Sequence, residues 1–368
     1  MIQEKTASFD TTNIAVKLNG WRYSFWKSAT IHTAIGEFAR EVTLSVSDSP
    51  DAASAAGNLY MDSPISIICD DKTVLTGYID NVDINYNASG HTIVLRARSK
   101  TCDLVDCSYK GDAQFNGQSA HNTINAICRP FGIKVIWDCP DWTIGEMNAN
   151  VGDTCAGIIT EICKRGGVFY TDDADGNLII TKPTETPSVT TIYNKYSDAE
   201  SNVLSATVKY SSRDRFSEYT VQSQDMTPDD YDSAEISYMS GGTVRDPGVT
   251  RYRPRVVIAQ TNQDSDTDTF SAELEYMSAT AAAAEFDYQI NGWRDDNGDI
   301  LTAGVFVNLA DEFAHVDSKL IIKSVDLSIS NTSGRTAQLK LVYPNALIKN
   351  YVPKTHNRDP WYYNGKEV

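Results

Sequence analysis

The chain has 368 residues, of which 41% are hydrophobic and 10% aromatic, so it holds enough apolar material for several packed cores. It carries 32 lysines and arginines against 49 acidic residues, a formal net charge of -17, and the acid is concentrated in the second half. A surface this acidic disfavours sequence-reading nucleic-acid binding and stable attachment to an anionic membrane. The first residues lack the features of a secretory signal, and no apolar run reaches the roughly 18 residues needed to span a bilayer.

The cysteines indicate a reducing environment. Their number is odd, they all lie in the first half, and no two have the spacing typical of a zinc site. We therefore expect reduced, mostly buried thiols rather than a disulfide framework. The seven are Cys69, Cys102, Cys107, Cys128, Cys139, Cys155 and Cys163.

Most of the chain has the patterning of β-strands. Residues 91–98, 203–210 and 337–341 alternate apolar and polar side chains, which predicts half-buried strands. In the second of these, Leu204 and Tyr210 fall on one side together with the apolar residues between them. Turn sequences rich in Asn, Asp, Ser and Gly separate the runs. The pattern predicts a mainly β, α+β fold.

Helices are few, and two of them lie together. The first follows Ser119 as its N-cap, and the second follows Asp153 and ends at Gly166. A hairpin with its turn at Gly176 comes directly after them. These elements predict a compact α/β unit over residues 101–183.

An acidic segment of the second half has part of the spacing of a calcium-binding loop. Its alternating carboxylates are Asp264, Asp266 and Asp268. Glu275 stands at the twelfth position of such a loop, but Thr269 occupies the sixth, where the sharp turn requires glycine. We interpret the segment as a solvated acidic loop leading into a third helix, from Ser271 to about Tyr288, and leave cation binding open.

Two segments of the chain resemble one another. Residues 77–98 and 320–343 each contain a Val-Asp-apolar strand, a Ser-Gly-x-Thr turn and a further strand. Each is preceded by another strand, over residues 65–69 and 305–309. The alternative is that any antiparallel meander has this pattern. We interpret the match as a duplicated β-domain, because the two elements recur in the same order.

Catalytic motifs are missing from the sequence. It contains no HExxH, GxSxG, P-loop or GxGxxG motif. Hydrolysis by two carboxylates stays open, since Asp and Glu are abundant. We predict no catalytic residue, no cofactor and no metal. The five histidines have no ligand spacing and are His32, His91, His121, His315 and His356.

The order of these patterns resembles the baseplate hub proteins of Mu-like contractile-tailed phages. The segment from Gly77 to Val105 resembles that family, especially residues 77–80 and the run from Arg98 to Asp106. The likeness extends over most of the chain. Further matching positions are Trp26, Ile31, residues 38–46, Phe169 and Tyr170 to Ile180, residues 291–293, residues 309–311 and residues 339–342.

The sequence patterns and the resemblance together predict a domain division, although the acidic loops and the tail show no clear family pattern. Residues 1–100 would form a first β-barrel-like tube domain and residues 101–183 a small α/β domain. Residues 184–350 would form a second tube domain with an insertion, comprising the acidic loop and helix, at about 211–302. Residues 351–368 would be a C-terminal tail.

The resemblance also implies an assembly. Three copies would form a ring with pseudo-six-fold symmetry, because two similar domains per chain turn three copies into six quasi-equivalent ones. The partners would be the hexameric tail tube protein, the trimeric membrane-piercing spike and other baseplate proteins. The ring would leave a channel for DNA, and we expect acidic and neutral polar side chains along it, because they repel phosphate.

The expected location is the tail baseplate of a virion assembled in the bacterial cytoplasm. Two alternatives stay open. One is a tail-associated enzyme that hydrolyses cell-wall or other glycans. The other is the equivalent hub of a tailocin or secretion spike.

Overall fold

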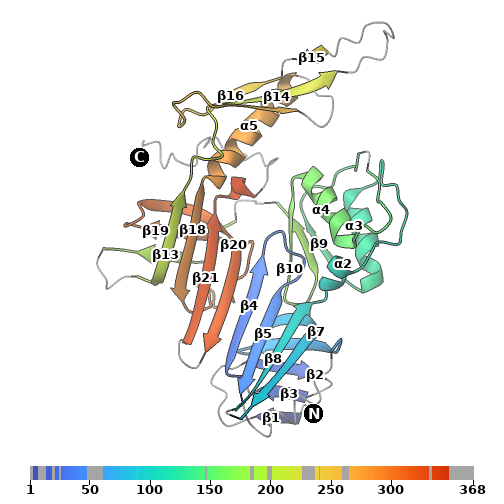
Figure 1. Cartoon of the computed structure of the whole chain (residues 1–368), viewed down its shortest axis with the longest axis vertical. Coiled ribbons are helices and arrows are strands. Elements are labelled where there is room, and N and C mark those ends of the chain that lie inside the picture. The colour runs from blue at the N-terminus through green and yellow to red at the C-terminus, as the bar shows by residue number, and fades with distance from the viewer. Residues whose placement is uncertain are drawn as a thin grey trace.

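A computed structural model describes most of the chain, and the fold is mainly β with few helices (Figure 1). The described residues are 3–6, 14–18, 21–24, 26–47, 61–88, 90–145, 147–182, 186–196, 201–225, 237–239, 241–258, 265–330 and 334–347. The expected tail, 351–368, and Asp264 of the acidic segment lie outside them.

One large sheet forms the body of the molecule. Its described strands follow the order β1-β3-β2-β6-β7-β8-β5-β4-β20-β21-β18-β13, and β12 and β19 join it beside β20. The strands of the first part are β1 (Gln3–Thr6), β2 (Ile14–Leu18), β3 (Trp21–Ser24), β4 (Ser28–Ala34), β5 (Glu41–Ser47), β6 (Pro64–Cys69), β7 (Lys72–Asn87) and β8 (Gly90–Ser99). Those of the second part are β12 (Thr191–Asn194), β13 (Val203–Tyr210), β18 (Ala284–Asn291), β19 (Phe306–Asp311), β20 (Val316–Ser330) and β21 (Gly334–Val342).

The predicted duplication is confirmed by the strand order. The first copy pairs its strands as β6-β7-β8-β5-β4 and the second as β19-β20-β21-β18-β13. Every neighbouring pair within both copies is antiparallel. In chain order the five strands take the same places in each copy, which makes this more than a generic meander.

The two copies also share an irregularity. Each has a register shift in its long hairpin, at Asp80 in the first copy and at Lys323 in the second. Two residues beyond these positions, Val82 faces Leu95 and Val325 faces Leu339. These landmarks set the correspondence of positions between the copies residue by residue, because a β-bulge fixes which side chains face the core.

The expectation of two barrel-like domains is wrong for the described strands, which form no closed barrel. Strand β4 of the first copy pairs instead with β20 of the second, so one sheet runs through both (Figure 1). A single apolar core follows this sheet from Ile14 to Leu341. The edge of β4 that could have closed the first copy, and the edge of β20 that could have closed the second, instead pair with each other.

The small α/β unit has its own core. Helices α2 (Cys102–Asp106), α3 (Ala120–Cys128) and α4 (Cys155–Gly166) pack with a sheet of β9 (Val135–Asp138), β10 (Phe169–Asp172) and β11 (Leu178–Thr181). Short 3-10 turns are Arg129–Phe131 here and Pro344–Ala346 after the last strand.

The helix ends of this unit match the sequence in part. Ser119 caps α3 as predicted, because its side chain accepts a hydrogen bond from the amide of Asn122. Thr154, not Asp153, caps α4 by accepting from the amide of Gly157. The stop lies at Gly167 rather than Gly166, because residue 167 has the left-handed φ of 58° that favours glycine.

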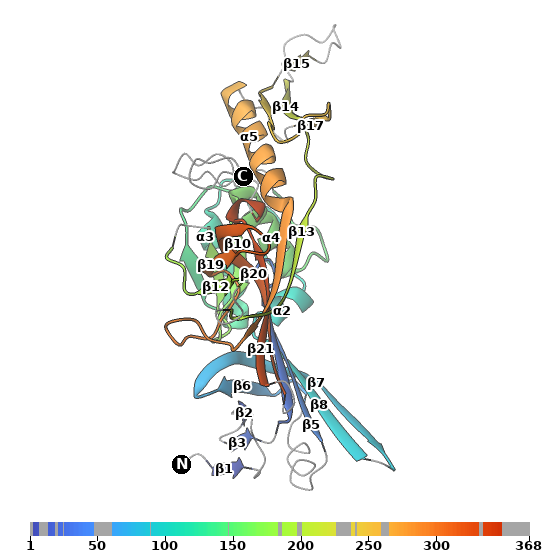
Figure 2. The same ribbon diagram turned by 90° about the vertical axis from the view of Figure 1, so that its left-hand side faces the viewer.

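An insertion separates β13 from β18. It contains β14 (Glu218–Asp225), β15 (Ser237–Met239), β16 (Thr243–Arg245), β17 (Pro254–Ile258) and α5 (Ser265–Ala282). It extends beyond the sheet at the end away from the N-terminus (Figures 1 and 2).

Two predictions for this insertion are wrong. The helix begins at Ser265, so Asp266 and Asp268 belong to its first turns rather than to a loop. It also ends at Ala282, not near Tyr288, because residues 284–291 form β18. Alternate residues of β18 are buried in the sheet core, and that burial overrides the helix propensity of the alanine run.

Candidate functional site: the junction between the two β-domains

The two copies of the β-domain meet through backbone pairing. Residues 28–34 of β4 run antiparallel to residues 324–330 of β20. Ile31 faces Leu327 and Ala29 faces Ile329, and all four side chains are at most 6% exposed. The junction therefore has a dry apolar side and behaves as part of one core.

An ionic contact crosses the open side of this junction. The Nδ1 atom of His32 lies 2.6 Å from Oδ1 of Asp326, and its Nε2 atom lies 3.1 Å from Oε2 of Glu37. The hydrogen bond to Asp326 raises the pKa of His32 to about 9, against the opposing effect of burial. His32 is therefore protonated at neutral pH and links the first copy to a carboxylate of the second.

A second polar contact lies at the turn between β6 and β7. Asp70 accepts hydrogen bonds from Arg294 at 2.9 Å and from Arg335 at 2.7 Å, both from the second copy. Lys72 donates to Asp299 at 2.6 Å. These ion pairs hold the first copy's turn against the second copy in a fixed position.

A buried ion pair fastens the small α/β unit to the first copy. Arg40 Nε lies 3.1 Å from Oδ2 of Asp172, and the two side chains are only 7% and 2% exposed. Arg40 also donates to the carbonyl oxygens of Asp172 and Val74. Paired and fully hydrogen-bonded, these charges fix the orientation of the unit at the sheet.

A groove of about 980 Å³ at the base of the insertion is lined by Tyr210, Asp311, His315 and Tyr343, among others. Asp311 is its buried carboxylate, and it already accepts hydrogen bonds from Tyr288, Asn194 and two backbone amides. Both oxygens of Asp311 therefore accept hydrogen bonds that hold this carboxylate in place.

The described residues contain no group of three His, Cys, Asp or Glu residues arranged to hold a metal. No described helix has the length and apolarity to cross a membrane. The predicted free thiols are confirmed, since all seven cysteines are unbridged. Burial raises the pKa of Cys128 to about 12, which keeps that thiol protonated and inert.

No site residue was predicted from the sequence, and the residues that join the domains were missed. His32 and Asp326 are 294 positions apart, and Arg40 and Asp172 are 132 apart. The repeated Val-Asp motif does contain Asp326, so the duplication was the available signal. Its partner could be found only from the strand pairing. His91, one of the histidines without ligand spacing, lies at the start of β8, opposite Tyr86.

Comparisons with known proteins match this architecture. Residues 13–99 match the N-terminal domain model of Mu phage baseplate assembly protein GpP-like proteins, and residues 101–182 match the second domain of gp44-like baseplate hub proteins. The baseplate hub protein gp44 of Escherichia phage Mu is 24% identical over 342 residues, which cover 90% of this chain and 88% of the Mu protein.

Two solved structures share the fold. The 43 kDa tail protein of prophage MuSo2 from Shewanella oneidensis has 26% identity and a TM-score of 0.76, over 91% of this chain and 99% of that one. The tail protein from Neisseria meningitidis MC58 has 18% identity and a TM-score of 0.76, over 93% and 99%. This chain therefore has the fold of these phage tail proteins. Within that class, the chain is a relative of the baseplate hub proteins of Mu-like phages.

Proposed function

We propose that this protein is the structural hub of a contractile-tail baseplate. The observation that carries the proposal is the repeated five-strand unit, joined within one chain through β4 and β20. A hub between a hexameric tube and a trimeric spike must offer six similar contacts on one side and three on the other. A chain with two similar domains supplies six such contacts from three copies.

The proposed assembly is a homotrimeric ring in which the two β-domains alternate. Residues 1–100 and 184–350 supply the quasi-six-fold part, and the latter range includes the insertion. Residues 101–183 have no second copy and keep three-fold symmetry only. The tail tube, the spike and other baseplate proteins are the proposed partners, and the virion tail is the proposed location.

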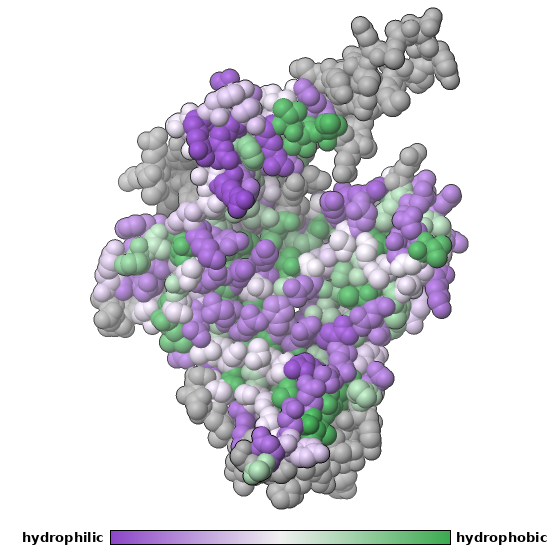
Figure 3. Space-filling view, viewed as in Figure 1, coloured by the Kyte–Doolittle hydropathy of each residue, from purple (hydrophilic) through white to green (hydrophobic). Residues whose placement is uncertain are grey.

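The ring is proposed to leave a channel through which DNA passes. An acidic or neutral lining would keep the duplex mobile, because it makes no phosphate contacts. Polar side chains cross the middle of the view in Figure 3, over the sheet. The polar face of the strands carries both signs: Asp83 accepts a hydrogen bond from Arg96, and Asp287 lies opposite Lys340. If this face lines the channel, its charges largely balance.

A structural rather than enzymatic role is part of the proposal. The relatives that match are named as hub and tail proteins, and both oxygens of the buried Asp311 carboxylate in the groove at the base of the insertion accept hydrogen bonds. The hydrolase alternative predicts cell-wall degradation by purified protein, lost on changing one Asp or Glu. A tailocin or secretion hub would share this architecture, and the neighbouring genes distinguish it.

The mass of the purified protein in solution tests the proposal. Light scattering should give three times the chain mass of 40.6 kDa. Electron microscopy of the same sample should show rings. A monomer or dimer in solution, with no ring, would contradict the hub assignment.

A further inference from the structure

The junction between β4 and β20 has a counterpart in the duplicated fold, formed by the corresponding strands β13 and β7. These two strands are not paired with each other within the described chain. Strand β20 uses one edge twice, first for β19 over residues 316–321 and then for β4 over residues 324–330. The corresponding edge of β7 pairs with β6 over residues 72–78. Beyond that point, residues 81–85 have no strand on this edge among the residues that the structure describes.

The complementary edge is on β13. This strand takes the place in the second copy that β4 takes in the first, and its inner edge pairs with β18. Along residues 205–209, the described part of the chain places no strand on the outer edge. Among the described residues, the sheet therefore presents one unpaired edge of each kind, β7 and β13, at opposite sides of the view in Figure 1.

Apolar side chains are exposed at both edges. Ile84 and Tyr86 on β7 are 58% and 76% exposed, and Tyr210 on β13 is 52% exposed. The residues at the matching positions of the internal junction are Leu327, Ile329 and Thr33, and each is at most 6% exposed. Leu327 is thus buried where β4 pairs with its edge, whereas Ile84, at the same position of the same fold, is exposed where the described residues place no strand. This difference is typical of a strand-addition interface.

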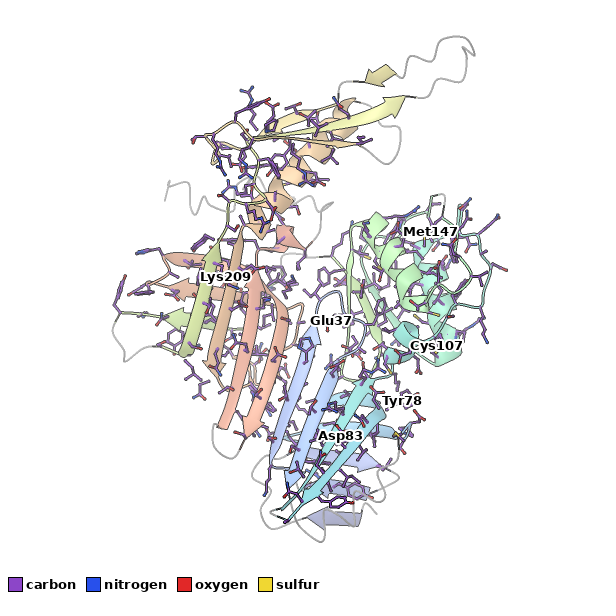
Figure 4. All side chains as sticks on the ribbon, viewed as in Figure 1. Glu37, Tyr78, Asp83, Cys107, Met147 and Lys209 are labelled. Atoms are coloured by element: carbon purple, nitrogen blue, oxygen red, sulfur yellow. The ribbon has the colours of Figure 1, made fainter. Side chains whose placement is uncertain are left out.

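The charges at these edges are complementary. Asp83 corresponds to Asp326 and Lys209 corresponds to His32, by the register that the two β-bulges establish. His32 and Asp326 face each other in the internal junction at 2.6 Å. A second junction built alike would place Lys209 opposite Asp83, a cation opposite an anion once more. Figure 4 shows these two residues at opposite sides of the sheet.

We infer that β13 of one subunit pairs antiparallel with β7 of the next, in the register of the internal β4–β20 junction. Val208 then faces Ile84, Thr207 faces Asn85 and Lys209 faces Asp83. The inference rests on the proposed hub function and names its partner surface as a second copy of this chain. Because the two edges differ, the contact is head-to-tail, and such a contact closes into a ring when the rotation permits.

Cysteine pairs test this register directly. Asn85→Cys with Thr207→Cys introduces thiols at positions that face each other across the inferred junction. Thr30→Cys with Ser328→Cys is the matched positive control, because these residues face each other within the chain. Asn81→Cys with Thr207→Cys is the off-register control, since its thiols lie about 13 Å apart along the strand, too far for a disulfide. Cys107 and Cys139, the two partly exposed native thiols, are changed to Ser throughout.

Mild oxidation and a non-reducing gel give the readout, with sedimentation in parallel. We expect covalent dimers and closed trimers from the Asn85/Thr207 pair, and single-chain mass from both control pairs. A trimer that forms without this crosslink, or that crosslinks the Asn81/Thr207 pair instead, overturns the inferred junction but leaves the hub function standing. A chain that stays monomeric and uncrosslinked overturns both.

Discussion

The two β-domains have the same strand order but different neighbouring strands. The difference is clearest at the corresponding strands β4 and β13. Both occupy the same place beside an antiparallel partner, β5 or β18. Ala29 and Ile31 of β4 are buried. Of their counterparts in β13, Ala206 is exposed and Val208 is half-buried. The difference lies in β20, which covers only β4. Burial at these positions therefore reports the presence of a partner strand rather than a property of the fold.

The largest expected loss of stability comes from removing the Arg40–Asp172 ion pair, which has no equivalent in the second domain. Arg40 holds Asp172 of the small unit, while the corresponding position in the second domain is Ala284. Arg40→Ala leaves Asp172 buried and unpaired, and should lower the free energy of unfolding by about 3–5 kcal/mol. Urea denaturation measures this.

Arg165 provides the control for that change. Arg165 forms an ion pair with Glu161, one turn earlier in the same helix, and both side chains are 40% exposed on the surface. Arg165→Ala should cost less than about 0.5 kcal/mol. Equal losses for the two variants would show that the Arg40 pair does not hold the small unit in place.

A matched pair of substitutions compares the closed and open junctions. Leu327 and Ile84 occupy corresponding positions but are 2% and 58% exposed. Leu327→Ala should lower the free energy of unfolding by about 2–5 kcal/mol through the cavity it leaves. Ile84→Ala should leave the unfolding of the monomer almost unchanged and weaken the trimer instead. Denaturation and sedimentation of both variants separate the two effects, and a large loss of monomer stability in Ile84→Ala would contradict the comparison.

The sequence predicted the elements better than their connections. The period-two runs, Ser119 and the Gly176 turn follow from local chemistry, and the Val-Asp repeat identified the duplication. The end of α5 was missed because burial of Phe286 and Tyr288 in the sheet outweighs helix propensity. The barrel expectation failed because only tertiary pairing decides whether β4 closes its own domain or joins β20. For the same reason Leu204, expected on the apolar side of its strand, is 56% exposed beside a register shift.

The ionic contact of the internal junction should make stability depend on pH. The pKa of His32 is raised from 6.5 to about 9, so its contribution is fully present below about pH 6.5 and is lost as pH rises through 9. We expect that contribution to be about 1 kcal/mol, because solvent screens a pair whose side chains are 30% and 45% exposed. The stability difference between the native protein and His32→Gln should therefore shrink between pH 6.5 and pH 10. A difference that stays constant would mean that the charge of His32 does not stabilise the junction.

The smallest expected effect concerns the charge that replaces His32 at the open edge. Lys209→Asp would place two carboxylates opposite each other, at Asp83 of the neighbouring subunit, and like charges across a strand pair cost about 0.2–1 kcal/mol. The dissociation constant at each junction should rise by about fivefold at most, and the effect should fade in high salt. Lys340→Asp makes the same charge change opposite Asp287 of its own chain. It should therefore lower the free energy of unfolding while leaving subunit association unchanged. If sedimentation at low salt shows both variants associating like the native protein, β13 does not meet Asp83, and the open edge of the second domain is covered in some other way.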